Sequence, residues 1–227
     1  MHPHVFKIGR DGRFLDLVLV PSGIPTPEYS SNQVVLHEDT WKQRKSPVIQ
    51  RLTSLCGMNK NRIHGRKTKV KKTDRNKARS FIDQHHLMGF GGGKVFLGLY
   101  SADDLVAIAA FSKVILMKYE TPTYRSAELV RFCSLSGFTV VGGLDKLVQH
   151  FLKHYETDDL ITYVDKETSD GRSFKRLGFD LIGETEPLHF TLVAGQRKRV
   201  EHSEKVDSAV ISNQGNWKYR LVKNQMR

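Results

Sequence analysis

The segment spanning residues 127–179 constrains the fold more than any other part of the chain. It contains runs with the alternation or apolar character of strands, separated by stretches with helical spacing. The strand-like runs lie at 127–133, 138–141 and 160–164, and the helical patterns at 144–152 and 171–179. A glycine pair, Gly142-Gly143, stands between the second run and the first helix, and Asp165 ends the third run. The pattern predicts strand, glycine turn, helix, strand, acidic turn, short helix and strand in that order.

The composition favours a soluble globular protein with an anionic partner. The 227 residues include 36 Lys and Arg against 24 Asp and Glu, a net charge of +12, which points most simply to nucleic acid. Cys56 and Cys133 belong to no ligand-spaced cluster, so we expect no metal site and a reducing compartment. No apolar run approaches the roughly 18 residues of a membrane span, and the polar start Met1–His4 has no signal-peptide core. We therefore expect a cytoplasmic protein without a membrane partner.

The remaining patterns divide the chain into four parts. Residues 1–58 are expected to form a small N-terminal αβ appendage with two short strands and a helix. Residues 59–75 are expected to be a basic linker, and residues 76–195 the main domain, in which 95–111 has the pattern of a β-hairpin. Residues 196–227 are polar and are expected to be a loosely held tail. The fold class predicted for the main domain is α+β, with a mixed, largely antiparallel sheet flanked by helices.

The segment 60–77 is the densest charge run, with nine cations opposed only by Asp74. Such a run is commonly a solvated linker. It can also grip phosphates, because each phosphate that is neutralised releases counterions and adds affinity. The cations that we expect to contact nucleic acid are Arg62, Arg66, Lys67, Lys69, Lys71 and Lys72, together with Arg131 and Arg172 outside this run.

The order helix, hairpin, strand, glycine turn, helix, strand, helix, strand is similar to that of the GNAT acyltransferases. Phe174–Phe179 resembles the aromatic-x-x-Leu-Gly-Phe signature of that fold. Four motifs resemble more specifically a bacteriophage group of GNAT-like proteins related to the Mom DNA-modification family. They are Glu128–Cys133, Val141–Leu147, Tyr163–Asp165 and Ser169–Gly171 with the following Leu-Gly-Phe, within a resemblance covering residues 76–192.

This resemblance implies a GNAT-like fold, an acyl group donated by acetyl-CoA or a related acyl-CoA, and modification of DNA. In that group the domain can follow a Vsr-like or homing-type endonuclease domain, and His37–Trp41 looks like the last helix of such a nuclease.

The glycine turn is the expected cofactor site. A strand that ends in glycines and enters a helix offers backbone N–H groups and the positive end of the helix dipole to a pyrophosphate. The residues expected to bind the cofactor are Val141, Gly142, Gly143 and Lys146. Thr139 stands where the usual acyl-CoA loop has Arg or Gln, and Leu144 where it has a later small residue.

Three residues are candidates for catalysis: Asp165, Ser169 and His86. Asp165 ends a strand, where side chains reach the cleft of an open sheet, and can act as a base for an attacking amine or cap the Ser169-Asp170-Gly171 turn. His86, like its neighbour His85, ends a helix and can serve in acid–base chemistry, face a phosphate or complement the helix dipole. Arg131 can pair with Glu128 across the sheet or reach a phosphate.

The leading hypothesis is a phage-encoded GNAT-like protein that transfers a small acyl-type group to the exocyclic amine of a base, DNA being the expected partner. A base inside a duplex would have to be flipped out, and Phe90, Tyr163 and Phe174 are candidates to stack on it. One alternative is a non-catalytic DNA-binding module left from an endonuclease fusion. Another is an active homing-type nuclease, for which the roughly 40 residues before His37 are too few to form a complete nuclease domain.

Overall fold

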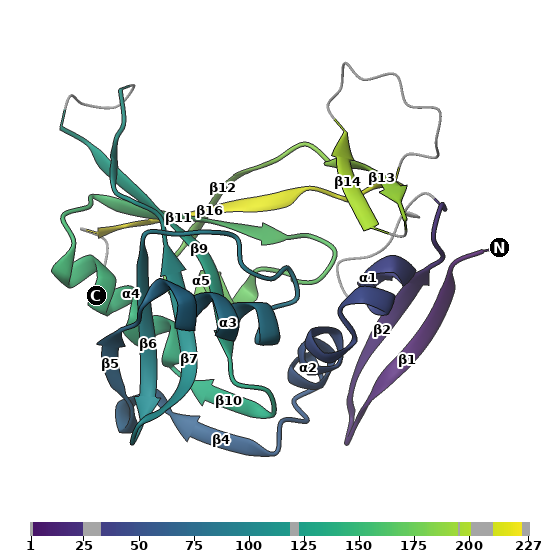
Figure 1. Ribbon diagram of the computed structural model, residues 1–227, viewed down its shortest axis with the longest axis horizontal. Helices are drawn as coiled ribbons and strands as arrows, with labels where there is room; N and C mark the ends of the chain where they lie inside the picture. The colour runs from purple at the N-terminus through teal and green to yellow at the C-terminus, as the bar shows by residue number, and fades with distance from the viewer. Residues whose placement is uncertain (1, 25–32, 119–122, 195, 201–210, 224–227) are drawn as a thin grey trace.

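The computed structural model describes residues 2–24, 33–118, 123–194, 196–200 and 211–223 (Figure 1). Its centre is a mixed sheet in the order β12-β16-β11-β9-β7-β6-β5, with β8 paired to β9. Neighbouring strands in this sheet run antiparallel except for β9 and β11, which are parallel. The predicted α+β class with a largely antiparallel sheet is therefore confirmed. No helix in these ranges is long and apolar enough to cross a membrane.

The N-terminal part is a three-stranded sheet covered by two short helices. Its elements are β1 (His4–Arg10), β2 (Arg13–Val20), β3 (Gln33–His37), α1 (Glu38–Gln43) and α2 (Lys45–Leu55). The sequence pattern predicts two strands and one helix here. It does not indicate β1, which pairs with β2 across the turn at Asp11 and Gly12. The predicted single helix is divided into α1 and α2 at Arg44. In one continuous helix, Pro47 would lack the N–H for the backbone hydrogen bond to residue 43, and its ring would clash with that carbonyl.

The segment predicted as a basic linker is folded. It forms β4 (Asn61–His64), η1 (Gly65–Lys67) and β5 (Lys69–Lys72). β4 pairs in parallel with β10 (Phe138–Val141), and β5 is the edge strand beside β6. Charge dominates the composition of this run, but Ile63 and Val70 pack against the main core and fix the two strands.

The main unit follows the predicted element order. It comprises α3 (Arg75–His85), β6 (Val95–Ser101), β7 (Asp104–Phe111), β8 (Ile115–Leu116), β9 (Arg125–Ser134), α4 (Gly143–His154), β11 (Asp159–Asp165), α5 (Arg172–Arg176) and β12 (Asp180–Glu184). The hairpin, the glycine turn, the amphipathic helix and the short helix all lie where the sequence places them. The element order on which the GNAT resemblance rests is thus present.

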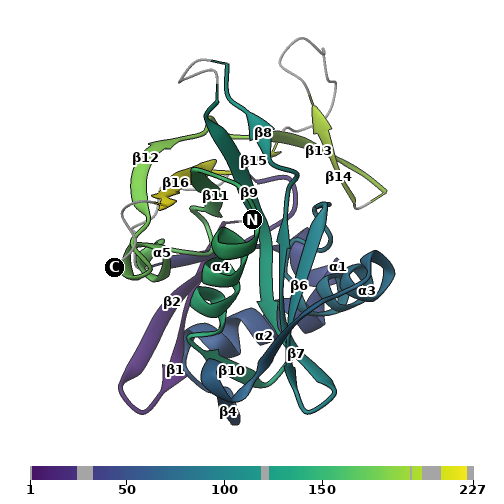
Figure 2. The ribbon, with the colours of Figure 1, turned by 90° about the vertical axis from the view of Figure 1, so that its left-hand side faces the viewer.

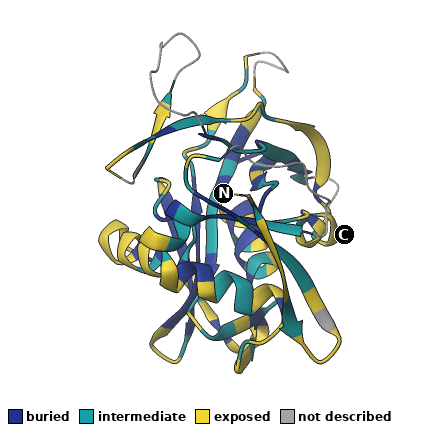
Figure 3. Ribbon diagram, turned by 90° about the vertical axis from the view of Figure 1, so that its right-hand side faces the viewer, coloured by how far each residue is buried: buried dark blue, intermediate teal, exposed yellow. Residues whose placement is uncertain are grey.

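The two faces of the sheet carry different helices. One core packs α4, through Leu147, Phe151 and their neighbours, against one face. A second core packs α3, through Ala78 and Ile82, against the other. Buried residues gather along the strands and the inner sides of the helices (Figure 3).

The C-terminal part is more ordered than a polar tail. β13 (His189–Val193), β14 (Gln196–Val200) and β15 (Ile211–Ser212) form a small sheet, and β16 (Asn216–Val222) is inserted between β11 and β12. The prediction of a loose tail is wrong for 216–222. Tyr219 and Leu221 are 1% and 2% exposed, so one face of this otherwise charged strand is core.

Candidate active site between β9 and β11

The parallel strands β9 and β11 separate part-way along their length. They pair only at Asp159 with Ser126, Leu160 with Ala127, and Ile161 with Glu128. Beyond these pairs β9 continues to Ser134 and β11 to Asp165. The two strands therefore form a wedge whose apex lies at Glu128 and which opens toward their carboxyl ends, where open sheets bind ligands.

A β-bulge lies beside the apex. Phe111 pairs with Leu129 and Ala110 with Arg131, so Val130 is the extra residue of β9. Thr162 donates its hydroxyl to the Leu129 carbonyl at 2.9 Å, which replaces a ladder bond lost as the strands diverge. Bulges re-aim side chains and often lie next to active sites.

Glu128 stands at the apex of the wedge. Its neighbours Ala127 and Leu129 belong to the core beneath α4, so by strand alternation Glu128 faces the side of α2 and α3. Burial raises the pKa of its carboxyl, an effect that Arg131 opposes. None of the described residues donates a hydrogen bond to this carboxylate, so it is available as a base. In the sequence, Glu128 is recognised as a potential ion-pair partner of Arg131 and as the first residue of the Glu128–Cys133 motif, but not as a base.

Arg131 lies on the same face and holds the glycine-rich segment in place. Its Nε donates to the Gly89 carbonyl at 3.1 Å and its Nη1 to the Val130 carbonyl at 2.8 Å. A Cβ on Gly91 would lie 2.6 Å from the guanidinium carbon, so the chain crosses directly over Arg131. The predicted phosphate contact of Arg131 stays a prediction.

His86 lies among arginines. Burial, followed by the charges of Arg131, Arg51 and Arg44, lowers its pKa to about 3. The imidazole is therefore neutral at pH 7, and because Nδ1 accepts a hydrogen bond from the Met88 N–H at 3.0 Å, its proton is assigned to Nε2.

The arginines around His86 come from the N-terminal part. Arg44 donates to the carbonyls of Asp83 and His86 at 2.8 and 2.7 Å, and Arg51 donates to the Thr168 carbonyl at 2.8 Å. Arg44 and Arg51 of the N-terminal part thus form one side of the candidate site, on the face of the sheet that bears Glu128. Sequence reasoning does not single out these two arginines, because only the tertiary structure brings them to His86.

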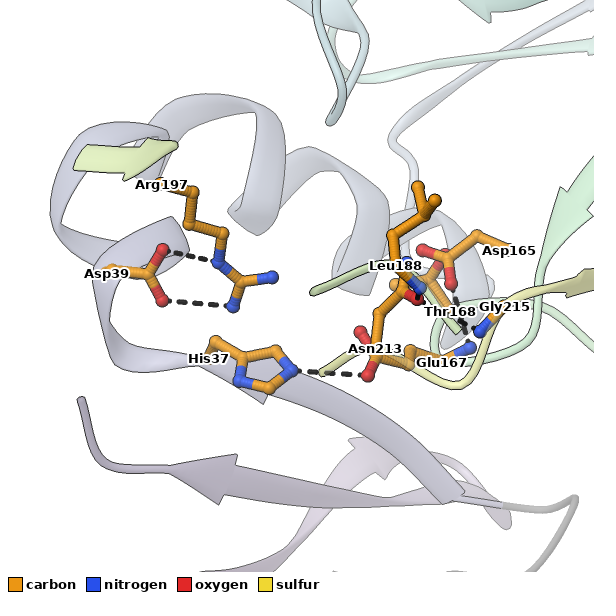
Figure 4. A network of polar contacts seen from close by, with 9 residues as sticks. All are labelled: His37, Asp39, Asp165, Glu167, Thr168, Leu188, Arg197, Asn213 and Gly215. Atoms are coloured by element: carbon orange, nitrogen blue, oxygen red, sulfur yellow. Dashed lines mark hydrogen bonds and ion pairs between the residues drawn. The ribbon is translucent and has the colours of Figure 1, made fainter. Parts of the chain in front are cut away.

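Asp165 and Ser169 lie in the turn after β11. Asp165 accepts hydrogen bonds from the Glu167 N–H at 2.9 Å and the Thr168 hydroxyl at 3.0 Å (Figure 4). The Ser169 hydroxyl accepts from the Gly171 N–H at 3.3 Å. Asp165 therefore caps the turn from 165 to 168, and the Ser169-Asp170-Gly171 turn, which the sequence offers as its capping target, is capped by Ser169 instead.

Burial, and next the charge of Glu167, raise the pKa of Asp165 from 3.8 to about 6. Because the folded-state pKa is raised, Asp165 lowers stability as pH increases from about 4 to about 6, and its cost is constant above that range. We expect Asp165→Asn to stabilise the protein by about 1–3 kcal/mol near pH 8 and by far less near pH 4. Urea denaturation at both pH values measures the difference, with the exposed Asp180→Asn as the control. An Asp165→Asn protein less stable than the wild type near pH 8 would contradict this.

The predicted cofactor turn has an open and a closed side. Gly142 has φ +69° and a Cβ there would meet no atom within 4 Å, so the turn is accessible. Gly143 is packed against Val140 and Leu99. Lys146 donates its amine to the carbonyls of Gly65, at 3.0 Å, and Thr68, at 2.5 Å, and so ties α4 to η1. Val141 is half-buried in the strand before the turn.

The predicted nucleic-acid contacts lie on several surfaces. Exposed positions are Arg62, Arg66, Lys67, Lys69, Lys71, Lys72 and Arg172. Lys71 lies 3.4 Å from Asp103, and Arg172 pairs with Asp170. His37, predicted to begin a nuclease-like helix, ends β3 as the N-cap residue of α1 and is buried, with its Nε2 3.2 Å from Glu167. The described residues contain no group of three or more His, Cys, Asp or Glu arranged to hold a metal ion.

No protein-family model and no curated protein matches the sequence. Three solved structures with similar backbones are Arabidopsis thaliana Naa50 with the bisubstrate analogue CoA-Ac-MVNAL, Arabidopsis thaliana NAA60 with acetyl-CoA, and a Bacillus subtilis acetyltransferase with CoA. Their TM-scores are 0.45, 0.45 and 0.44, and their identities 8%, 11% and 10%. The matches cover 68%, 69% and 69% of this chain and 98%, 99% and 99% of those chains.

Proposed function

We propose that the protein is a GNAT-like acyltransferase that uses acyl-CoA. The observation that carries this proposal is the wedge between β9 and β11, with a half-buried carboxylate at its apex that accepts no hydrogen bond from the described residues. The accessible turn at Gly142 supports it, because the first N–H groups of α4 have no intrahelical partners and suit a pyrophosphate.

In the proposed reaction, Glu128 accepts a proton, and Arg131 with the segment over it shields the site from water. Bound acyl-CoA would supply a thioester carbonyl that an amine can attack. The Glu128 carboxylate takes a proton from the attacking amine as the new C–N bond forms. The C–S bond then breaks, and the thiolate leaves with the bonding electron pair and takes up a proton. Arg131 and the segment over it, through Gly91, exclude water from this face.

The proposed acceptor is an exocyclic amine of a nucleic-acid base, with DNA favoured. The net charge of +12 and the exposed cations of β4, η1 and β5 support a polyanionic partner. The resemblance to the Mom-related phage group points the same way. Mass spectrometry of nucleosides from expressing cells tests it: a new modified base should appear with the wild type and be absent with Glu128→Gln.

Calorimetry tests cofactor binding. Acyl-CoA should bind the wild-type protein, and Gly142→Trp should abolish binding because an indole would fill the open side of the turn. Gly137→Trp is the matched control: Gly137 lies at the other end of β10, has φ +79°, and its Cβ position is equally open. Equal losses in both variants would refute the cofactor site.

The second candidate is a non-catalytic DNA-binding module. Two observations favour it: Lys146 is engaged by backbone carbonyls, and Gly65 packs on the Gly142 carbonyl, 3.1 Å from its Cβ position. A protein that binds oligonucleotides but no acyl-CoA would establish this alternative.

A further inference from the structure

A basic groove lies on the face of the sheet opposite Glu128. It occupies about 380 Å³ between α4, the edge strand β5 and the residue that follows β16. The lining residues are Val70, Lys146, Gln149, His150, Leu152, Lys153, His154 and Lys223. Figure 2 shows α4 in front of the sheet on this side. Only Lys146 among these residues is assigned a role by the sequence analysis.

The groove concentrates positive charge. Lys146 and Lys153 lie two helical turns apart on one side of α4, and Lys223 faces them from the end of β16. None of the lining residues is acidic. Within the described part of the chain, no carboxylate forms an ion pair with Lys153 or Lys223. Their ammonium groups can therefore bind an external anion.

The basic surface extends beyond the groove at one end. The Lys146 amine donates to the carbonyls of Gly65 and Thr68, which brings η1 against α4. The cations of η1, Arg66 and Lys67, are exposed. The cations thus follow a track along α4 rather than surround a single point.

Part of the groove lining is apolar or aromatic. Val70 and Leu152 contribute aliphatic surface, and the rings of His150 and His154 stack with centroids 4.0 Å apart and planes 24° from parallel. Burial, followed by the charges of His154, Lys153 and Lys146, lowers the pKa of His150, so its ring is neutral at pH 7 and can stack on a base.

We propose that this groove binds the backbone of a nucleic acid, with phosphates on Lys153 and Lys223 and a base against the histidine rings. A track of cations beside a stacking surface fits a single-stranded polynucleotide, whereas an acidic peptide would use only the charge. The groove anchors the polymer away from Glu128. This inference adopts the nucleic-acid partner of the proposed function but does not depend on acyl transfer.

Fluorescence anisotropy of a labelled single-stranded oligonucleotide, measured without acyl-CoA over a range of salt concentrations, tests the groove. The variant Lys153→Gln/Lys223→Gln should lose about tenfold or more in affinity, and the slope of log affinity against log salt should fall by about 1.4. The matched control is Lys77→Gln/Arg79→Gln, at two exposed positions of α3, which removes the same charge from the other face of the sheet. It should lose less than about threefold.

If the two double variants lost equal affinity, or the control lost more, the proposed binding site in the groove would be refuted, and binding would be explained by the overall positive charge. The proposal would also be refuted if the oligonucleotide were displaced by polyglutamate, or by a mononucleotide, at a concentration of carboxylates or phosphates equal to that of the oligonucleotide phosphates. If the double variant does not melt cooperatively, Lys153→Gln alone carries the test, because Lys153 is exposed. Oligonucleotide binding that persists in Gly142→Trp, with acyl-CoA binding lost, separates this inference from the proposed function.

Discussion

Glu128→Gln is expected to lower the rate of acyl transfer by about 10²–10⁴-fold while acyl-CoA binding is retained. Glutamine keeps the size of the side chain but cannot accept the proton that the attacking amine must lose. The carboxylate is placed for that role by the register of β9 and β11, which puts it where the two strands part.

The pH dependence gives a second readout. Burial raises the pKa of Glu128, so the wild-type rate should increase with pH as the carboxylate forms. The residual rate of Glu128→Gln should lack that rise. Glu156→Gln, which changes an exposed carboxylate paired with Arg125, is the control and should keep both rate and profile. A Glu128→Gln protein within about threefold of the wild type would remove Glu128 from the mechanism.

The unit from 127 to 179 could be predicted from the sequence because its elements are neighbours along the chain. Each strand or helix there carries its own period, and the turns are marked by Gly142 and Gly178. β16 could not be recognised in the same way. Lys218 and Arg220 make this segment resemble a polar tail. Its other face, with Tyr219 and Leu221, is buried only because β11 and β12 pair with the strand on either side.

The candidate site was predictable only in part for a related reason. The glycine turn and Asp165 are visible as local motifs, whereas the role of Glu128 depends on its pairing with Ile161, a register that no local pattern encodes. The wall around His86 depends on Arg44 and Arg51, which come from the N-terminal part. In sequence alone, Glu128 is one charged residue in an alternating strand.

Arg197→Ala is expected to have the largest effect on stability, a loss of about 3–5 kcal/mol. Arg197 binds Asp39 through two hydrogen bonds, from Nε to Oδ2 at 2.7 Å and from Nη2 to Oδ1 at 3.0 Å (Figure 4). Asp39 is 4% exposed, so removing its partner leaves an uncompensated charge inside the protein. The pair joins β14 to α1, and its loss should also loosen the N-terminal part that carries Arg44 and Arg51.

Thermal and urea unfolding of matched variants can isolate this effect. Arg199→Ala, on the same side of β14 but exposed, should change stability by less than about 0.5 kcal/mol. The double variant Arg197→Met/Asp39→Asn should be considerably more stable than Arg197→Ala, because it buries no unpaired charge. If Arg197→Ala and Arg199→Ala unfolded alike, the pair would contribute no more than a surface contact. The arginine wall at His86 would then have to be held by Arg44 and Arg51 alone, through their bonds to the carbonyls of Asp83, His86 and Thr168.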